Sequence, residues 1–292
     1  MSLQTVMRWL NRVHRRSVRI RCRYRYVRSP KPLAASAKTY VTLFVDDHGR
    51  WSRNDPQAEI SRRGVVWILD VLARGSIRAT FNVVGKHAVE DAVILRRIIA
   101  EGHEIACHTM EHKSVLRCSA QAIEHDMMRF REAMVVYLPR GVTGFRAPRS
   151  EWNFAVLRGL LNAGILWNAE SDKNPFPYVI MSRGQKRLWR LPVSIDDWEY
   201  ETHAVTPREM AVSWTRVVEH AMERHYYAAI GVHPWVIAKD QSRMRMFSEF
   251  VQYLGGAESV ICAPFADVAA LCESASHPTA IENGRSLHLD AF

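Results

Sequence analysis

Hydrophobic positions follow two alternating patterns from residue 40 onward. Short apolar runs rich in β-branched and aromatic residues predict strands, and longer segments with apolar residues at three- and four-residue spacing predict helices. Strands are expected at residues 40–46, 77–85, 103–108, 142–145, 165–169, 187–194, 226–233 and 259–263, and helices at 62–75, 91–102, 120–137, 153–164, 207–224, 243–256 and 265–274. The repeated strand–helix order predicts an α/β fold, a parallel sheet with helices outside it.

Polar side chains occur where several of these strands end. If the sheet closes into a barrel, its chemistry is expected at the carboxyl ends of the strands. The polar residues at those ends are Asp46 and Asp47 after the first strand, His108 and His112 after the third, Arg146 after residues 142–145, Asp196 and Asp197 after residues 187–194, and His233 at the end of residues 226–233. We therefore expect these side chains to meet at one end of the barrel.

The first 38 residues differ from the rest of the chain. They contain eleven Lys or Arg and no acidic residue, so the net charge of +10 belongs to this segment, and the remainder holds 29 basic and 30 acidic residues. Apolar residues recur at helical spacing over residues 3–13, beside a basic face. This segment has three possible interpretations. It is a disordered basic extension, a helix that contacts an anionic membrane surface, or a nucleic-acid-binding segment, which is the least favoured of the three.

Length and composition suit one domain between two tails. A chain of 292 residues with 48% hydrophobic content can bury a large core. We expect a basic extension over residues 1–38, a domain over 39–275 and a C-terminal tail over 276–292. Five cysteines without CxxC spacing, and no secretory signal pattern, predict a cytoplasmic protein, with peripheral membrane contact through the extension as the variant of that prediction.

The segment "HTMEH" suggests a metal site. His108 and His112 are four residues apart, so both imidazoles can reach one cation, and Asp47 at another strand end is the expected third ligand. A metal ion with these three protein ligands keeps open coordination positions for water and substrate. Asp46 could then act as general base beside Arg146, and His233 as general acid.

Taken together, these motifs resemble a known family. Asp46–Asp47, "HTMEH", "RAP", "DDW" and "HPW", in this order, are similar to the five motifs of the polysaccharide deacetylases, which share the NodB homology domain, and the likeness covers roughly residues 39–275. The intracellular peptidoglycan-deacetylase-like and allantoinase-like branch is the most similar. Two features differ from the usual pattern: His48 replaces a glycine in the first motif, and Arg149–Ser150 replace an aromatic–glycine pair in the third.

The resemblance implies a distorted (β/α) barrel of about seven parallel strands and the hydrolysis of an N-acetyl or other acyl group. It implies one divalent metal ion, with Zn²⁺ expected, held by Asp47, His108 and His112. Asp46 would be the base, Arg146 would steady it, and His233 would be the acid, supported by Asp196 or Asp197, a choice the sequence leaves open. Five residues in or beside the motifs are expected to contact substrate: His48, Trp51, Pro148, Trp198 and Trp235.

The expected partner is an acetylated amino sugar, a glycan or a sugar-containing metabolite. Two alternatives stay open: hydrolysis of cyclic amides or ureides on the same barrel, and an inactive carbohydrate-binding protein. A full set of metal ligands weighs against an inactive protein and against a metal-free cyclic amidase.

The basic extension generates a first prediction. Deleting residues 1–38 should leave turnover of a dissolved substrate unchanged and weaken salt-sensitive binding to anionic vesicles, because surface charges act through screened Coulomb attraction. Vesicle co-sedimentation at low and high salt measures the effect. Equal vesicle binding with and without the segment would exclude membrane contact through it.

Overall fold

The computed structural model describes residues 38–172, 174–224 and 227–276. Ten strands form one sheet whose order is β6-β7-β5-β4-β3-β2-β1-β9-β8, with β10 paired to β1. The strands are β1 (Thr39–His48), β2 (Thr80–Val83), β3 (Glu104–Cys107), β4 (Gly144–Phe145), β5 (Trp167–Ser171), β6 (Tyr178–Arg183), β7 (Lys186–Val193), β8 (Ile195–Asp196), β9 (Tyr227–Val232) and β10 (Val260–Cys262). Every pairing is parallel except that of β6 with β7.

The strands close into a ring. β8 follows β7 after the single residue Ser194, whose backbone N–H donates to the carbonyl of Ala229 in β9. β7 pairs with β5 at one edge and with β6 at the other, and its continuation through Ser194 and β8 pairs with β9. With β7 and β8 counted as one strand, seven parallel strands make the ring, so the predicted α/β barrel is confirmed.

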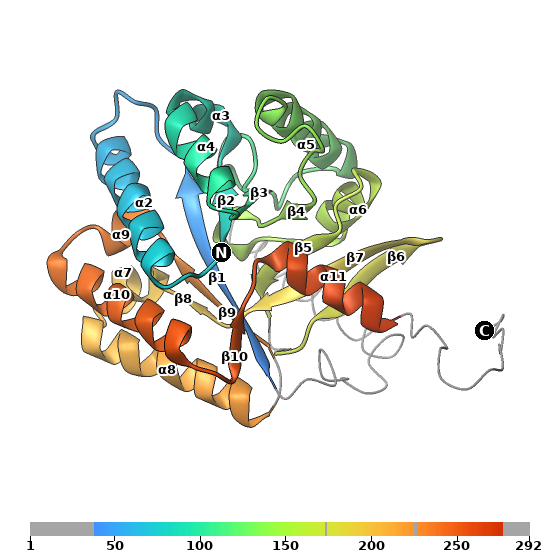
Figure 1. Cartoon of the computed structure of the whole chain (residues 1–292). Coiled ribbons are helices and arrows are strands. Elements are labelled where there is room, and N and C mark those ends of the chain that lie inside the picture. The colour runs from blue at the N-terminus through green and yellow to red at the C-terminus, as the bar shows by residue number, and fades with distance from the viewer. Residues whose placement is uncertain (1–37, 173, 225–226, 277–292) are drawn as a thin grey trace, which may run out of the picture.

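Helices surround this ring (Figure 1). They are α2 (Pro56–Arg74), α3 (Gly85–Ala88), α4 (Ala92–Ala100), α5 (Ala120–Met134), α6 (Phe154–Asn162), α7 (Trp198–His203), α8 (Pro207–Glu223), α9 (Pro234–Ile237), α10 (Gln241–Gly256) and α11 (Phe265–Ser276), with short 3-10 turns η1 (Val89–Asp91) and η2 (Pro148–Ser150). In the figure α2, α8 and α10 lie on one side of the strands, and α5 and α6 lie on the other.

Three features depart from the sequence prediction. No element was predicted between the strands at residues 165–169 and 187–194, but β6 lies there and forms an antiparallel hairpin with β7. α2 begins at Pro56 rather than residue 62, because the Asp55 side chain accepts from the Gln57 N–H and proline favours the first helical position. The short helices α3, α7 and α9 were not predicted, since a helix of four to six residues has too few positions to show a period.

The alternation of each strand divides the core in two. Outward-facing residues of β1, such as Leu43 and Val45, belong to the larger cluster with the helices. Inward-facing Phe44 belongs to a second cluster with Trp167 and Phe265. Phe265 begins α11 and lies 5.6 Å from the Phe44 ring and 4.7 Å from the Trp167 ring, so α11 closes the amino-terminal end of the barrel. The carboxyl-terminal end is left for the polar residues.

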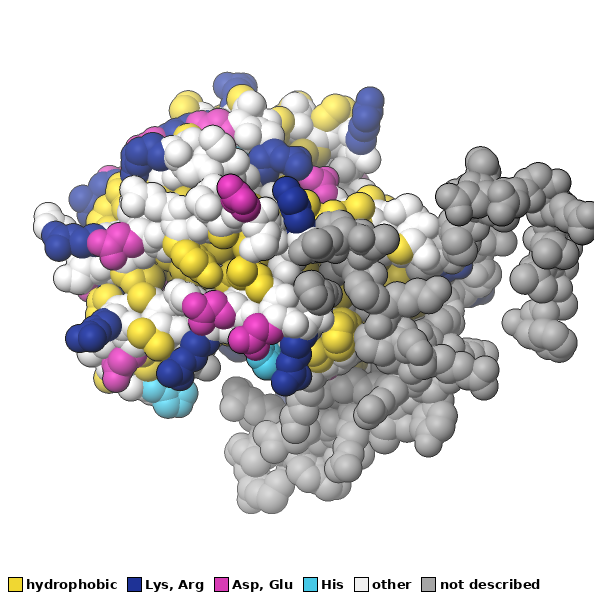
Figure 2. Space-filling model, turned by 60° about the horizontal axis from the view of Figure 1, so that its bottom comes forward, with side chains coloured by type: hydrophobic (Ala, Val, Ile, Leu, Met, Phe, Trp, Pro, Cys, Tyr) yellow, Lys and Arg dark blue, Asp and Glu magenta, His cyan; other side chains and the backbone are white. Residues whose placement is uncertain are grey.

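Charges on the described surface are mixed in sign. Figure 2 shows basic and acidic side chains interspersed on the face it presents. This agrees with the near-zero net charge of the chain beyond residue 38. None of the described helices is both long enough and apolar enough to span a bilayer. The predictions for residues 1–37 and 277–292 concern segments outside the described residues and stay predictions.

Close packing inside the barrel depends on Gly231 in β9. A Cβ atom there would lie 2.1 Å from Cζ of Phe44 and 3.0 Å from Cβ of Asp196. We predict that Gly231→Ala lowers the free energy of unfolding by about 1–3 kcal/mol, because overpacking displaces neighbours in a dense core. Equilibrium urea unfolding measures this change.

Gly256→Ala is the matched control, since a Cβ at Gly256 in α10 would meet nothing within 4 Å. We expect the control to be neutral or slightly stabilising, as alanine favours helix over glycine. Equal stability of the two variants would contradict the packing of Phe44 against Gly231.

Candidate active site

A β-bulge at the end of β1 brings two neighbouring carboxylates to one place. Strict alternation would turn Asp46 inward, like Phe44, and Asp47 outward, like Val45. The register with β2 instead shifts between Val45 and His48, and Asp47 adopts a φ of 70°. Such a bulge re-aims a side chain. Both aspartates are consequently buried at the carboxyl end of the barrel, each 1% exposed.

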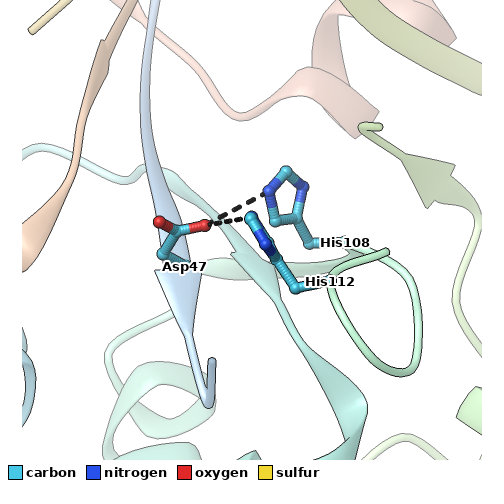
Figure 3. A group of neighbouring side chains, drawn as sticks. All are labelled: Asp47, His108 and His112. Atoms are coloured by element: carbon cyan, nitrogen blue, oxygen red, sulfur yellow. Dashed lines mark ion pairs between the residues drawn. The ribbon is translucent and has the colours of Figure 1, made fainter. Parts of the chain in front are cut away.

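Asp47 faces two histidines from the loop after β3 (Figure 3). Its Oδ1 lies 2.8 Å from Nε2 of His112 and 3.4 Å from Nε2 of His108. The segment "HTMEH" is a loop rather than a helix, with Thr109 and His112 both in the left-handed region at φ 66° and 52°. These three residues are the group among the described ones whose ligand atoms lie close enough together to hold a metal ion.

The hydrogen bonds of this group fit a cation. Nδ1 of His108 lies 2.8 Å from the carbonyl of Arg146, which fixes Nδ1–H as donor and leaves Nε2 with a lone pair. Oδ1 of Asp47 receives no hydrogen bond from the described residues. Burial lowers the pKa of His112 despite the opposing effect of Asp47, so the neutral ring predominates. Oδ1 of Asp47 and the Nε2 atoms of the two histidines therefore converge, and with both Nε2 atoms unprotonated a divalent ion would satisfy all three.

Asp46 has a separate set of partners. Its Oδ1 accepts from Nδ2 of Asn82 at 2.7 Å, and its Oδ2 accepts from Nε of Arg146 at 2.6 Å. Burial alone would raise the pKa of Asp46, but the charge of Arg146, with further contributions from two histidines, lowers it below the usual value. Asp46 is thus kept ionised and is not among the grouped metal ligands.

Arg146 is itself held on several sides. Its guanidinium donates to the Ser150 hydroxyl at 3.1 Å and to the Ala169 carbonyl at 3.2 Å, and it lies over the Phe44 ring at 4.7 Å. Asp196 is 3.4 Å from Nη2 of Arg146. Burial opposes the charge, yet the surrounding carboxylates raise the pKa of Arg146, so the cation persists.

His233 is paired with Asp197. The two carboxylate oxygens of Asp197 contact Nδ1 of His233 at 2.5 Å and accept from its backbone N–H at 2.7 Å. Burial disfavours the imidazolium, but Asp197 raises the pKa of His233 above its ordinary value. Nε2 of His233 is left facing Asp46, 4.0 Å from Oδ2. Of the two aspartates that the sequence could not separate, Asp197 supports His233 and Asp196 contacts Arg146.

The five residues expected to contact substrate lie in different surroundings. Trp51, Trp198 and Trp235 form a row, with ring centroids 5.9 Å apart for Trp51–Trp235 and 6.0 Å apart for Trp198–Trp235. Trp198 is 47% exposed and lies 6.0 Å from the His233 ring. Pro148 is buried at the start of η2. His48 is 1% exposed.

Three polar contacts of the aspartates were missed in the sequence. Asn82 interrupts the apolar strand β2, and a lone amide at an inward position could have indicated a partner for Asp46. Arg50 donates to Oδ2 of Asp47 at 2.8 Å, and Trp235 donates to the same oxygen at 3.1 Å. No motif marks Arg50; only its spacing of three residues from Asp47 connects the two.

Part of the chain is similar in sequence to known proteins. Residues 35–166 match the family model of polysaccharide deacetylase. A chitooligosaccharide deacetylase of Rhizobium leguminosarum bv. trifolii is 39% identical over 98 residues, which are 34% of this chain and 46% of that protein. The peptidoglycan-N-acetylglucosamine deacetylase PgdA of Listeria monocytogenes serotype 1/2a (strain 10403S) is 24% identical over 105 residues, 36% of this chain and 22% of that protein. The chain thus spans about half or less of these curated relatives.

Solved structures extend the likeness of the fold to most of the chain. PuuE allantoinase superposes with a TM-score of 0.76 at 15% identity, covering 87% of this chain and 96% of that one. A family 4 carbohydrate esterase from Streptomyces lividans superposes with a TM-score of 0.52 at 16% identity, covering 77% of this chain and 91% of that one. At these identities the likeness concerns the fold alone.

The converging acceptors generate a metal-content prediction. We expect the purified protein to carry about one equivalent of a divalent ion, and His112→Ala to lose most of it, since two ligands bind far more weakly than three. Elemental analysis of desalted protein measures the content. His220→Ala is the control, because His220 is an exposed residue of α8, and full occupancy in His112→Ala would refute the ligand assignment.

Proposed function

We propose that this protein is a metal-dependent amide hydrolase, because residues 35–166 match the family model of polysaccharide deacetylase. It would remove an N-acetyl or other acyl group from an amino sugar or a sugar-containing metabolite. The observation that carries the proposal is the placement of the Asp47–His108–His112 group beside the two charged pairs, Asp46 with Arg146 and His233 with Asp197. An acid, a base and a cation site at one barrel end are the parts that amide hydrolysis requires.

The metal group would be held by one carboxylate and two imidazoles. Zn²⁺ is the expected ion for this donor set. When bound, it would supply Lewis-acid stabilisation of the charge that develops on the acyl oxygen and would acidify the attacking water. The carbonyl of Arg146 keeps the His108 ring in the tautomer and orientation that this role needs.

Asp46 would take the proton of the attacking water. Arg146 and Asn82 bind one oxygen each, so the carboxylate is held in a fixed direction. The lowered pKa of Asp46 keeps it available as an acceptor at neutral pH. A base that is ionised and positioned before the reaction avoids the cost of reorienting during it.

His233 would supply the proton that the leaving nitrogen needs. Asp197 binds its Nδ1 and its backbone N–H, which fixes the ring and directs Nε2 into the site. The raised pKa of His233 keeps Nε2 protonated near neutral pH. As the carbon–nitrogen bond breaks, the proton passes from Nε2 to nitrogen, and the products are a carboxylic acid and a free amine.

The row Trp51–Trp235–Trp198 would form the wall of the substrate site. The exposed face of Trp198 beside His233 suits the apolar face of a sugar ring. His48 and Pro148, both buried, would act by shaping the site. The curated relatives are deacetylases of chitooligosaccharides and of peptidoglycan N-acetylglucosamine, which favours an acetylated amino sugar over a cyclic ureide.

A substrate panel tests the proposed reaction class. We expect release of acetate from N-acetylated amino sugars or their oligomers in the presence of Zn²⁺, and no opening of allantoin or other cyclic ureides. Acetate release and amine formation are measured together. Ureide hydrolysis without acetate release would replace the proposal with the cyclic-amide alternative, and hydrolysis of neither class would favour an inactive binding protein.

The roles of acid and base can be separated with two substrates. His233→Ala should lower amide turnover by roughly 10²- to 10⁴-fold and impair an activated aryl acetate much less, since a phenolate leaves without a proton. Asp46→Asn should impair both substrates, because each needs the water deprotonated, and should keep its metal. Turnover numbers and metal content measure these effects.

His220→Ala serves again as the control, with both activities unchanged. Equal losses on the two substrates for His233→Ala would remove His233 as the acid. Metal loss in Asp46→Asn would mean that the roles of Asp46 and Asp47 are exchanged.

A further inference from the structure

We propose that Arg50 is a positioning residue that limits Asp47 to one-oxygen ligation and weakens the binding of the cation. The inference rests on the proposed function, because it assumes that Asp47, His108 and His112 hold a divalent ion. It assigns a role to a residue outside every motif of the sequence. The role concerns the strength of metal binding, and it can be measured apart from catalysis.

The two oxygens of Asp47 have different surroundings. Oδ2 accepts from Nη1 of Arg50 at 2.8 Å and from Nε1 of Trp235 at 3.1 Å. Oδ1 receives no hydrogen bond from the described residues and faces the two histidines. Two donors on Oδ2 leave little capacity there for a cation, so Asp47 is prepared to ligate through Oδ1 alone.

The turn after β1 holds Arg50 in this place. The backbone N–H of Arg50 donates to the carbonyl of Asp47 at 3.1 Å, and Gly49 between them has a φ of 81°. The guanidinium lies over the Trp51 ring at 4.7 Å, and Trp51 contacts Trp235 edge to face at 5.9 Å. The side chain of Arg50 is 32% exposed. Ring stacking and the short turn therefore restrict the guanidinium to the Oδ2 side of Asp47.

The two donors should affect a cation in opposite directions. Trp235 is neutral, so it orients the carboxylate without repelling a second positive charge. Arg50 carries a full positive charge next to the ligand and partly neutralises the negative charge of Asp47. It also repels a divalent ion, and this repulsion is only partly screened because the site is partly buried. When a cation is bound, Arg50 would reduce the electron density that Asp47 donates and so would preserve Lewis acidity toward the acyl oxygen. Arg50 thus lowers the affinity of the site for the cation and raises the Lewis acidity of the cation that is bound.

Zn²⁺ affinity of the full-length chain tests this division. We expect Arg50→Gln, which removes the charge and keeps a donor, to bind Zn²⁺ about tenfold more tightly in chelator competition, since it removes a nearby repulsion. Arg50→Lys keeps the charge and should stay within about threefold of the wild type. Trp235→Phe should bind about tenfold more weakly, the usual effect of losing a hydrogen bond to a ligand. Thermal unfolding of the metal-free variants checks that each one is folded.

Each outcome decides something. Equal weakening in Arg50→Gln and Arg50→Lys would show that Arg50 only orients Asp47, and unchanged affinity in Arg50→Gln would show that it does not act on the site; either result overturns the proposal. If the wild type bound no Zn²⁺, the cation site of the proposed function would itself be wrong. Tighter Zn²⁺ binding by Arg50→Gln with lower turnover per bound ion is the expected result.

Discussion

Asp46 and Asp47 are adjacent in the chain and almost fully buried, so two negative charges lie inside the barrel without solvation by water. A buried carboxylate remains ionised only where opposite charges or hydrogen-bond donors replace the water that it has lost. The surroundings of the two aspartates satisfy this requirement in different ways. Asp46 is neutralised by Arg146, whereas Asp47 keeps one oxygen that no described donor fills. That difference separates a proton acceptor from a metal ligand.

The barrel supplies these partners through strand alternation. Along β1, the inward position Phe44 packs in the apolar interior, and the next inward position, Asp46, is polar and lies at the carboxyl end. Asn82 of β2 reaches Asp46 in the same way, and Arg146 follows β4. Because the carboxyl ends of parallel strands all lie on one side of the barrel, residues that are far apart in the chain meet there. α11 fills the opposite end with Phe265.

The acid, the base and the cation site depend on one another electrostatically. Arg146 neutralises Asp46 and, through its backbone carbonyl, also orients His108. Asp197 raises the proton affinity of His233, whose Nε2 lies 4.0 Å from Asp46. Removing any one of these charges therefore changes the pKa values of the neighbouring groups, because the interior of low polarity screens charges weakly. For this reason the proposed roles are best separated by measurements that record metal content and turnover independently.

Local pattern was enough to identify most of the fold. β1 and β9 are short apolar runs, the long helices have clear periods, and the polar residues that end the strands were recognised as one set. The hairpin of β6 and the six-residue helix α7 were missed, because short elements contain too few positions to show a period and depend on neighbouring strands or loops for stability.

The sequence by itself determined a parallel α/β sheet and which kinds of side chain gather at its carboxyl end, since both follow from local periodicity and strand direction. Only the tertiary structure decided the contacts of each one. Asp197, not Asp196, supports His233, and the left-handed backbone of Asp47 turns it toward the histidines. Neighbouring residues with the same side chain are distinguished by a bulge or a turn, and those are set by pairing with distant strands.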